Sequence, residues 1–130
     1  MIDKIALLHI ENRKLLCILS KGKTLYYIPG GKREQGESDE ETLIRESKEE
    51  LNVDVIPGTY RYYGTYRAQA DGKAEGVVVQ VTAYFASFKG TPEASSEIDR
   101  IDWLSYDDKM KSSLVDHAIF DDLKKDGLID

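Results

Sequence analysis

The chain has 130 residues, of which 41% are hydrophobic, and its 24 acidic side chains outnumber 18 basic ones to give a net charge of −6. This length predicts a single domain over residues 1–130, large enough to bury a core without disulfides or a structural metal. Cys17 is the only cysteine, which excludes an internal disulfide and a cysteine-based zinc site and is typical of the reducing cytoplasm.

The remaining composition excludes two classes of partner. An acidic chain with a pI near 5.0 is poorly suited to bind the phosphate backbone of nucleic acids. The first residues show no secretory signal, and the longest run of apolar character, residues 76–88, is shorter than the ~20 residues that span a bilayer. We therefore expect a cytoplasmic protein that binds neither nucleic acid nor a membrane.

The N-terminal segment reads as three strands. Residues 4–10 and 14–20 are apolar runs separated by a short polar stretch, which predicts a β-hairpin. Residues 24–28 predict a third strand, and the following sequence Pro-Gly-Gly at residues 29–31 is expected to stop it.

A helix is predicted over residues 38–51. Ser38 and Glu41 have the spacing of a capping box, in which each side chain bonds to the backbone of the other residue. Asn52 follows the last turn and suits the left-handed conformation that ends many helices. The inward face is predicted by helical spacing and comprises Leu43, Ile44, Ser47 and Leu51.

The C-terminal half predicts more strands and a second helix. The expected strands cover residues 53–56, 59–66, 76–88 and 100–104. An amphipathic helix follows over residues 114–125, capped by Ser113 and Asp116 and ended by Gly127. Strands that surround two helices predict an α/β (α+β) fold with a mixed β-sheet covered by helices.

Charge is concentrated in the first predicted helix. Residues 1–36 carry a net charge of +4, whereas residues 37–50 and residues 97–130 each carry −5. On a helix, Glu46, Glu49 and Glu50 fall within an arc of about 100°, where like charges repel. A hard divalent cation such as Mg²⁺ would reverse that repulsion. The alternative is an acidic face that water solvates.

The spacing of these residues resembles a known motif. The sequence from Gly31 to Val53 resembles the Nudix box, a 23-residue pattern of glycine, glutamates and arginine. The matching positions are Gly31, Glu37, Arg45, Glu46, Glu49, Glu50 and Val53. Asn52 stands in place of the box glycine and Ser47 in place of an aliphatic residue. The short length also resembles that of the small MutT-type Nudix hydrolases.

The resemblance implies an α/β/α sandwich that hydrolyses nucleoside diphosphate compounds with Mg²⁺, or sometimes Mn²⁺. The implied metal ligands are Glu46, Glu49, Glu50 and the backbone carbonyl of Gly30. Glu46 or another nearby carboxylate would be the general base. Glu37 and Arg45 resemble a structural ion pair, and Glu97 resembles a downstream glutamate that some members use as a further ligand or base. The alternative for Glu97 is a loop glutamate without a role.

Other residues carry weaker signals. Lys32 and Arg33 follow the glycines and are candidates for binding phosphate, although each alone could be a solvated surface charge. The tyrosines at positions 60, 62, 63 and 66 form an aromatic cluster in the sequence. Tyr60 and Tyr62 suit a strand face, and the alternative for the cluster is a wall on which a base stacks. Tyr26 and Tyr27, which precede the glycines, raise the same alternative.

The expected function is a Mg²⁺-dependent pyrophosphohydrolase that converts a nucleoside triphosphate to a monophosphate and pyrophosphate. Cleavage of another nucleoside diphosphate-linked compound would release phospho-X in place of pyrophosphate. ADP-ribose and nucleoside-diphosphate-sugar hydrolases, and a non-catalytic module that senses nucleotides, are the alternatives. Ala68 occupies a position where ADP-ribose hydrolases tend to carry a proline, which favours a triphosphate substrate. A monomer or a homodimer is expected.

Overall fold

A computed structural model describes all 130 residues. In chain order the strands are β1 (Ile2–Leu8), β2 (Ile10–Glu11), β3 (Lys14–Ser20), β4 (Gly30–Lys32), β5 (Asp54–Val55), β6 (Arg61–Gln69), β7 (Val78–Phe85), β8 (Phe88–Lys89) and β9 (Ile98–Leu104). The helices are α1 (Asp39–Leu51), the short 3-10 helix η1 (Tyr106–Lys111) and α2 (Leu114–Lys125). None of the helices is long and apolar enough to cross a membrane.

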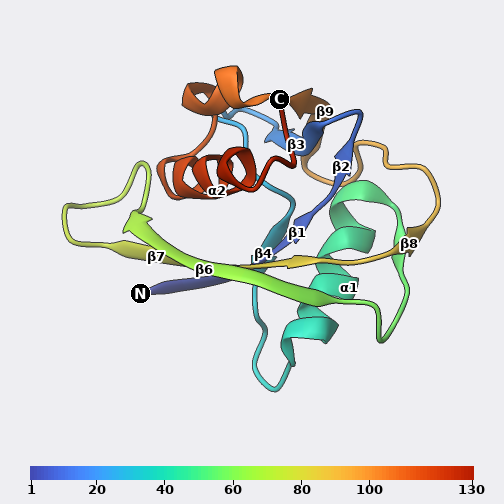
Figure 1. The fold of residues 1–130 in the computed structure, drawn as a ribbon. Coiled ribbons are helices and arrows are strands. Elements are labelled where there is room, and N and C mark those ends of the chain that lie inside the picture. Colours follow the sequence, from blue (N-terminus) through green and yellow to red (C-terminus); the bar gives the residue numbers. More distant parts are fainter.

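The main sheet is mixed and lies between α1 and α2 (Figure 1). Its strands stand in the order β4, β1, β7, β6, and β1 runs parallel to β7 and antiparallel to β4. Alternate residues of β1 enter different cores: Ala6 and Leu8 pack with α2, whereas Ile5 and Leu7 pack with α1. The predicted fold class, a mixed sheet covered by helices, is confirmed.

The predicted hairpin of residues 4–10 with residues 14–20 is wrong. The first of these runs forms the centre of the main sheet, while β3 belongs to a second sheet with the order β2, β3, β9. Only the two residues of β2 pair back onto β3, across a turn in which Asn12 and Arg13 have φ of 51° and 61°. Because β1 is buried on both faces, pairing with β7 and β4 buries more apolar surface than a local hairpin would.

The predicted strand over residues 24–28 is also wrong. This segment makes only isolated bridges, from Tyr27 to Ile18 and from Tyr26 to Ser112. The glycines that were expected to stop a strand instead begin β4, where Gly30 and Gly31 pair with β1.

The boundaries of α1 follow the predicted signals. The Ser38 Oγ accepts from the Glu41 N–H at 3.1 Å, and the Glu41 carboxylate accepts from the Ser38 N–H at 3.0 Å. Asn52 has φ of 54° and ends the helix in the left-handed conformation. Leu43, Ser47 and Leu51 are buried as expected. The capping box therefore fixes the start of the helix that carries the clustered glutamates.

The C-terminal half agrees with the prediction in type but not in every boundary. The strand expected at residues 59–66 extends to Gln69, and the run at residues 76–88 is divided into β7 and β8. The 3-10 helix η1 was not predicted. The helix at residues 114–125 is confirmed, and Gly127, with φ of 73°, follows its last turn.

Asp116 does not cap α2 as predicted. Its carboxylate is buried and accepts from the Ser113 hydroxyl at 2.8 Å and from the Ile28 N–H at 3.1 Å. Both donors bond to the same oxygen, Oδ2. Burial raises the pKa of Asp116 to about 6. The side chain thus ties the start of α2 to the segment that leads into β4.

Substituting Gly30 by alanine should destabilise the fold severely. Gly30 has φ of 147°, and a Cβ atom there would lie 2.0 Å from the backbone oxygen of Ile5. We expect Gly30→Ala to lower the free energy of unfolding by about 3 kcal/mol or more, as measured by urea denaturation. Gly58→Ala is the matched control, because Gly58 has φ of 81° but no atom within 4 Å of the added Cβ. The Gly58→Ala variant should lose only about 1–2 kcal/mol of unfolding free energy. An equal loss in the two variants would contradict the role of the close contact between Gly30 and Ile5.

The stability of an Asp116→Asn variant should diverge from that of the wild type as pH rises. Because the folded-state pKa of Asp116, about 6, lies above the ordinary value of 3.8, the wild type loses stability between pH 4 and 6. An asparagine keeps one oxygen for both donors and carries no charge. We expect the variant to gain about 2–3 kcal/mol relative to the wild type over this range, and no further advantage above it. Urea denaturation at several pH values tests this, with the exposed Asp107→Asn as control; a difference independent of pH would contradict it.

Candidate active site

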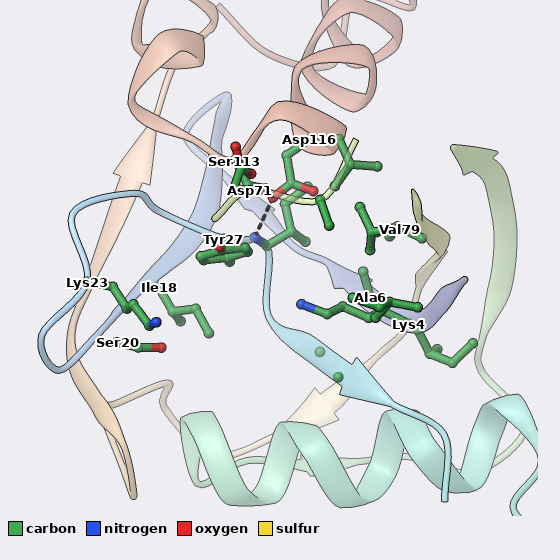
Figure 2. A pocket seen from close by; sticks show the side chains of 18 of the residues that line it. Lys4, Ala6, Ile18, Ser20, Lys23, Tyr27, Asp71, Val79, Ser113 and Asp116 are labelled. Carbon is green, nitrogen blue, oxygen red and sulfur yellow. Dashed lines mark hydrogen bonds between the residues drawn. The ribbon is translucent and has the colours of Figure 1, made fainter. Parts of the chain in front are cut away.

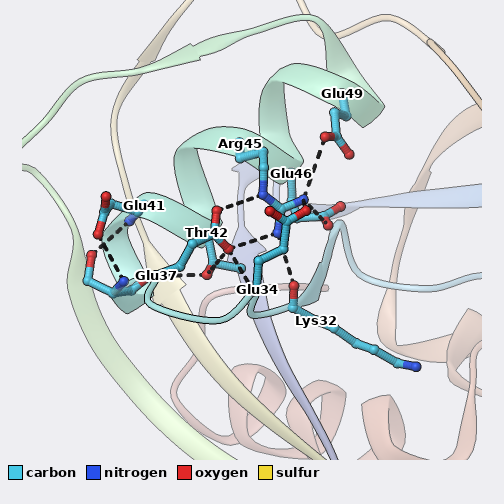
Figure 3. A network of polar contacts seen from close by, with 9 residues as sticks. Lys32, Glu34, Glu37, Glu41, Thr42, Arg45, Glu46 and Glu49 are labelled. Atoms are coloured by element: carbon cyan, nitrogen blue, oxygen red, sulfur yellow. Dashed lines mark hydrogen bonds and ion pairs between the residues drawn. The ribbon is translucent and has the colours of Figure 1, made fainter.

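Arg45 is the centre of a polar network at the start of α1 (Figure 3). Its Nε and Nη2 atoms donate to the two oxygens of Glu37 at 2.7 and 2.9 Å, and Nη2 also donates to the carbonyl of Lys32 at 3.0 Å. The Arg45 hydrogen bonds lower the pKa of Glu37 to about 2. The structure thus brings the two residues of the expected structural pair together. The pair ties the loop after β4 to the helix.

Glu46 is held between Arg45 and the glycine strand. The Arg45 Nη1 atom donates to Glu46 Oε1 at 2.8 Å. On its other side the carboxyl group lies so close to Gly31 that a Cβ there would stand 2.5 Å from Glu46 Cδ. Burial raises the pKa of Glu46, and Arg45 opposes this effect. A larger residue at position 31 would force this carboxyl group to move.

Glu50 contacts the preceding glycine. Its Oε1 atom accepts from the Gly30 N–H at 2.7 Å, and burial raises the pKa of the carboxyl to about 8. Glu49 is different, because its side chain is about half exposed and lies 3.5 Å from Arg45 Nη1. Two of the three clustered glutamates of α1 therefore face the two glycines of β4, and the third reaches towards solvent.

These residues fit a hard divalent cation by their chemistry. No three acidic, histidine or cysteine side chains converge as a ready-made metal site in this structure. The side chains instead bond within the protein, Glu46 to Arg45 and Glu50 to the Gly30 N–H. Carboxylate and backbone carbonyl oxygens are nevertheless the ligands that Mg²⁺ prefers. Glycine at position 31 leaves room beside one of these carboxylates.

Glu97 lies in the loop before β9, and this loop is attached to the end of α1. The Ser95 N–H donates to the Glu50 carbonyl at 3.1 Å, and the Glu93 N–H donates to the Leu51 carbonyl at 3.0 Å. The Glu97 carbonyl accepts from the Lys21 N–H at 2.9 Å, and the residue is exposed. The backbone thus holds this loop beside the last turn of the helix.

A cavity of about 300 Å³ adjoins the glutamates (Figure 2). Gly30, Gly31 and Glu50 line one part of it, and Ser113 and Asp116 line another. Between them lie apolar side chains of the main sheet and three lysines. These residues are Ala6, Val79 and Val81, with Lys4, Lys23 and Lys73. The cavity therefore extends from the last turn of α1 to the start of α2.

Sequence reasoning missed most of this cavity. Lys4 and Asp116 were not predicted as site residues, although both line it, whereas Tyr27 was a candidate for stacking on a base and lines it too. One signal was present for Lys4: it alternates with Ile2 and Ala6 along β1, so it places a charge on an apolar face. Asp116 comes from a segment distant in sequence, so only the fold shows that it meets Lys4 in the cavity.

The predicted phosphate-binding residues lie outside the cavity. Arg33 forms ion pairs with Asp3, at 2.8 Å, and with Asp39. Lys32 is exposed, and its carbonyl accepts from Arg45. Their contact with phosphate stays a prediction.

The tyrosine cluster considered as a stacking wall also lies outside the cavity, which none of Tyr60, Tyr62, Tyr63 and Tyr66 lines. Tyr60 and Tyr62 pack edge-on against Tyr84, with ring centroids 5.4 and 5.9 Å away. Tyr84 belongs to the core beside α1, whereas Ala6, Val79 and Val81 of the cavity lining belong to the core beside α2.

Comparisons with known proteins agree with this arrangement. No protein with a curated description matches the chain. The solved structure of the E. coli ORF135 protein is 23% identical and has a TM-score of 0.74, with 99% of this chain and 94% of that one covered. A Nudix hydrolase family member from Chromobacterium violaceum, described as putative in its name, is 22% identical (TM-score 0.75; 96% and 77% covered). The MutT protein from Bacillus halodurans is 21% identical (TM-score 0.70; 93% and 80% covered).

At these identities the solved structures establish a shared fold, and the family follows from the sequence itself. Nudix hydrolases cleave phosphorus-containing anhydrides in nucleotide-type small molecules and generally need a divalent metal. A model of the NUDIX domain matches residues 4–121. The chain therefore belongs to the Nudix hydrolase family.

Proposed function

We propose that this chain is a Mg²⁺-dependent pyrophosphohydrolase that cleaves a nucleoside triphosphate to a nucleoside monophosphate and pyrophosphate. One observation carries the proposal: the cavity reaches the Glu50 carboxylate at one end and runs away from α1 towards α2. A nucleoside in the cavity would therefore direct its phosphate chain towards the clustered glutamates.

The cavity suits a nucleoside in size and lining. About 300 Å³ lies at the lower end of small-molecule pockets, which are mostly apolar with a few polar groups that fix orientation. The apolar side chains of Ala6, Val79 and Val81 and the ring of Tyr27 offer surface for a base. Asp116 offers a hydrogen-bond acceptor. Lys4, Lys23 and Lys73 add positive charge that favours a phosphorylated ligand.

The carboxylates of α1 would hold the metal and accept the proton. Glu46, Glu49, Glu50 and the Gly30 carbonyl are the proposed ligands of Mg²⁺ or Mn²⁺. When bound, the ion neutralises phosphate charge and lowers the pKa of a water ligand. Glu46 or a neighbouring carboxylate takes the proton from the attacking water.

Two pairs of residues complete the proposal outside the cavity. Glu37 and Arg45 hold the helix against the loop after β4, which keeps the proposed ligands in place. Lys32 and Arg33 are proposed to contact the outer phosphates. For Arg33 this requires one of its two ion pairs to open.

Removing one carboxylate of α1 should abolish turnover. We expect Glu49→Gln and Glu50→Gln each to lower kcat/KM at least about 100-fold, because a lost ligand weakens stabilisation of the reacting phosphate. Phosphate and pyrophosphate release should be measured with Mg²⁺ and with Mn²⁺ on nucleoside triphosphates, ADP-ribose and nucleoside-diphosphate sugars. A chelator should stop the reaction.

The control is Glu75→Gln, which removes an exposed carboxylate from the turn between β6 and β7. Undiminished activity in the Glu50→Gln variant would refute the ligand assignment. Activity on ADP-ribose or on sugar nucleotides alone would replace the triphosphate proposal. Nucleotide-dependent thermal stabilisation without any turnover would instead identify a sensing module.

Glu97 should contribute to turnover more weakly. Its loop is fixed to the last turn of α1, so a further ligand or base can reach the site from there. We expect Glu97→Gln to lower kcat about tenfold or more with little change in KM. Glu93→Gln, in the same loop, is the control. Equal kinetics in the Glu97→Gln variant and the wild type would identify Glu97 as a loop residue without a role.

A further inference from the structure

Lys4 places a positive charge inside the cavity without an ion-pair partner. Its side chain extends from β1, is partly buried and lines the cavity (Figure 2). The ion pairs of the protein involve other cations, and no hydrogen bond joins the Lys4 Nζ atom to a neighbour. The Lys4 Nζ atom lies over the Tyr27 ring, 5.2 Å from the ring centroid. Partial burial of an ammonium group that has no direct ion pair or hydrogen bond is unfavourable for folding, so we expect the lysine to serve another purpose.

The strand register places Lys4 beside the glycines. Lys4 pairs with Lys32 in β4, and the next two residues of β1 pair with Gly31 and Gly30. Residues directly opposite each other in an antiparallel pair share a face of the sheet. Lys4 and Lys32 therefore lie side by side on one face, and Lys4 is the one that lines the cavity.

The Lys4 side chain also lies between the two carboxylates that line the cavity. Glu50, from α1, bonds to the Gly30 N–H, and Asp116 lies at the start of α2. Figure 2 shows the Lys4 amine directed into the space between the glycine strand and Asp116. A ligand that fills this space and reaches the glutamates of α1 must pass the ammonium group.

We propose that the Lys4 ammonium binds the phosphate group nearest the nucleoside. This inference rests on the proposed function, because it assumes a nucleoside in the cavity and its phosphate chain at α1. The phosphate that joins these two parts of a nucleotide passes through the space that Lys4 occupies. It supplies the direct ion-pair partner that Lys4 lacks, because Glu50 and Asp116 act on Lys4 only from beyond ion-pair distance, and a charge-assisted hydrogen bond forms.

Lys4 has one other candidate role, which the experiment must separate from phosphate binding. Its charge opposes the effect of burial on the pKa of both Asp116 and Glu50, so it could serve only to balance these two carboxylates. In that case its removal would change nucleoside and nucleotide binding alike, or neither. Binding of a phosphate predicts a loss that depends on the phosphate group.

The test compares ligands that differ by one phosphate. Binding of AMP, GMP, CMP and UMP and of the four corresponding nucleosides is measured by NMR titration without added metal. We expect Lys4→Met to bind the tightest of the monophosphates at least about tenfold more weakly, with binding of its nucleoside unchanged. Lys4→Arg keeps the charge and should retain most of the affinity. Lys89→Met, an exposed lysine of β8, is the matched control and should match the wild type.

Three results would overturn the proposal: unchanged monophosphate binding in Lys4→Met, an equal loss for nucleoside and monophosphate, or no monophosphate binding by the wild-type protein at millimolar concentration. Lys4→Gln provides the same comparison if the methionine variant does not fold. The readout is binding without metal, so it is independent of turnover. A protein that hydrolyses no nucleotide but shows the expected loss would refute the proposed catalysis and leave the role of Lys4 intact.

Discussion

The close approach of β4 to both β1 and α1 is the constraint on which the candidate site depends. Gly30 lies against the backbone of Ile5, and Gly31 lies against the carboxyl group of Glu46. A side chain at Gly30 would push β4 away from β1, and one at Gly31 would force the Glu46 carboxyl group to move. The Gly30 N–H is then free to meet the Glu50 carboxylate at 2.7 Å. Two adjacent glycines thus bring the helix that carries the glutamates to the edge of the main sheet.

The carboxylates on and before α1 differ in their hydrogen-bond partners. Arg45 bonds to Glu37 and Glu46, whereas Glu50 receives only the N–H of Gly30. The consequences are opposite: the Arg45 hydrogen bonds hold the pKa of Glu37 at about 2, and burial raises the pKa of Glu50 to about 8. One arginine cannot neutralise all the carboxylates that surround it. The carboxyl groups of Glu46 and Glu50, which lie nearest β4, are therefore the ones whose charged forms burial disfavours.

The sequence allowed the helices and the box to be predicted because their signals are local. Ser38, Glu41 and Asn52 act within one or two turns, and the structure shows each in its expected role. The hairpin was mispredicted because strand pairing depends on which distant strand buries more surface, and β1 pairs with β7, more than seventy residues away. The loop glycines were misread for the same reason, since β1 turns their segment into a strand.

The cavity escaped prediction because its polar groups come from segments that meet only in the fold. The box supplies Gly31 and Glu50, but Lys4, Tyr27 and Asp116 come from β1, the segment after β3 and α2. Asp116 is an example of a cavity residue that lies outside the box. Both of its hydrogen-bond donors bond to a single oxygen, which an uncharged amide would also provide, and burial opposes its ionisation. The hydrogen bonds of Asp116 therefore do not require its charge, and the side chain lines the cavity. Residues outside the box therefore form most of the cavity lining, and only the fold brings them beside Glu50.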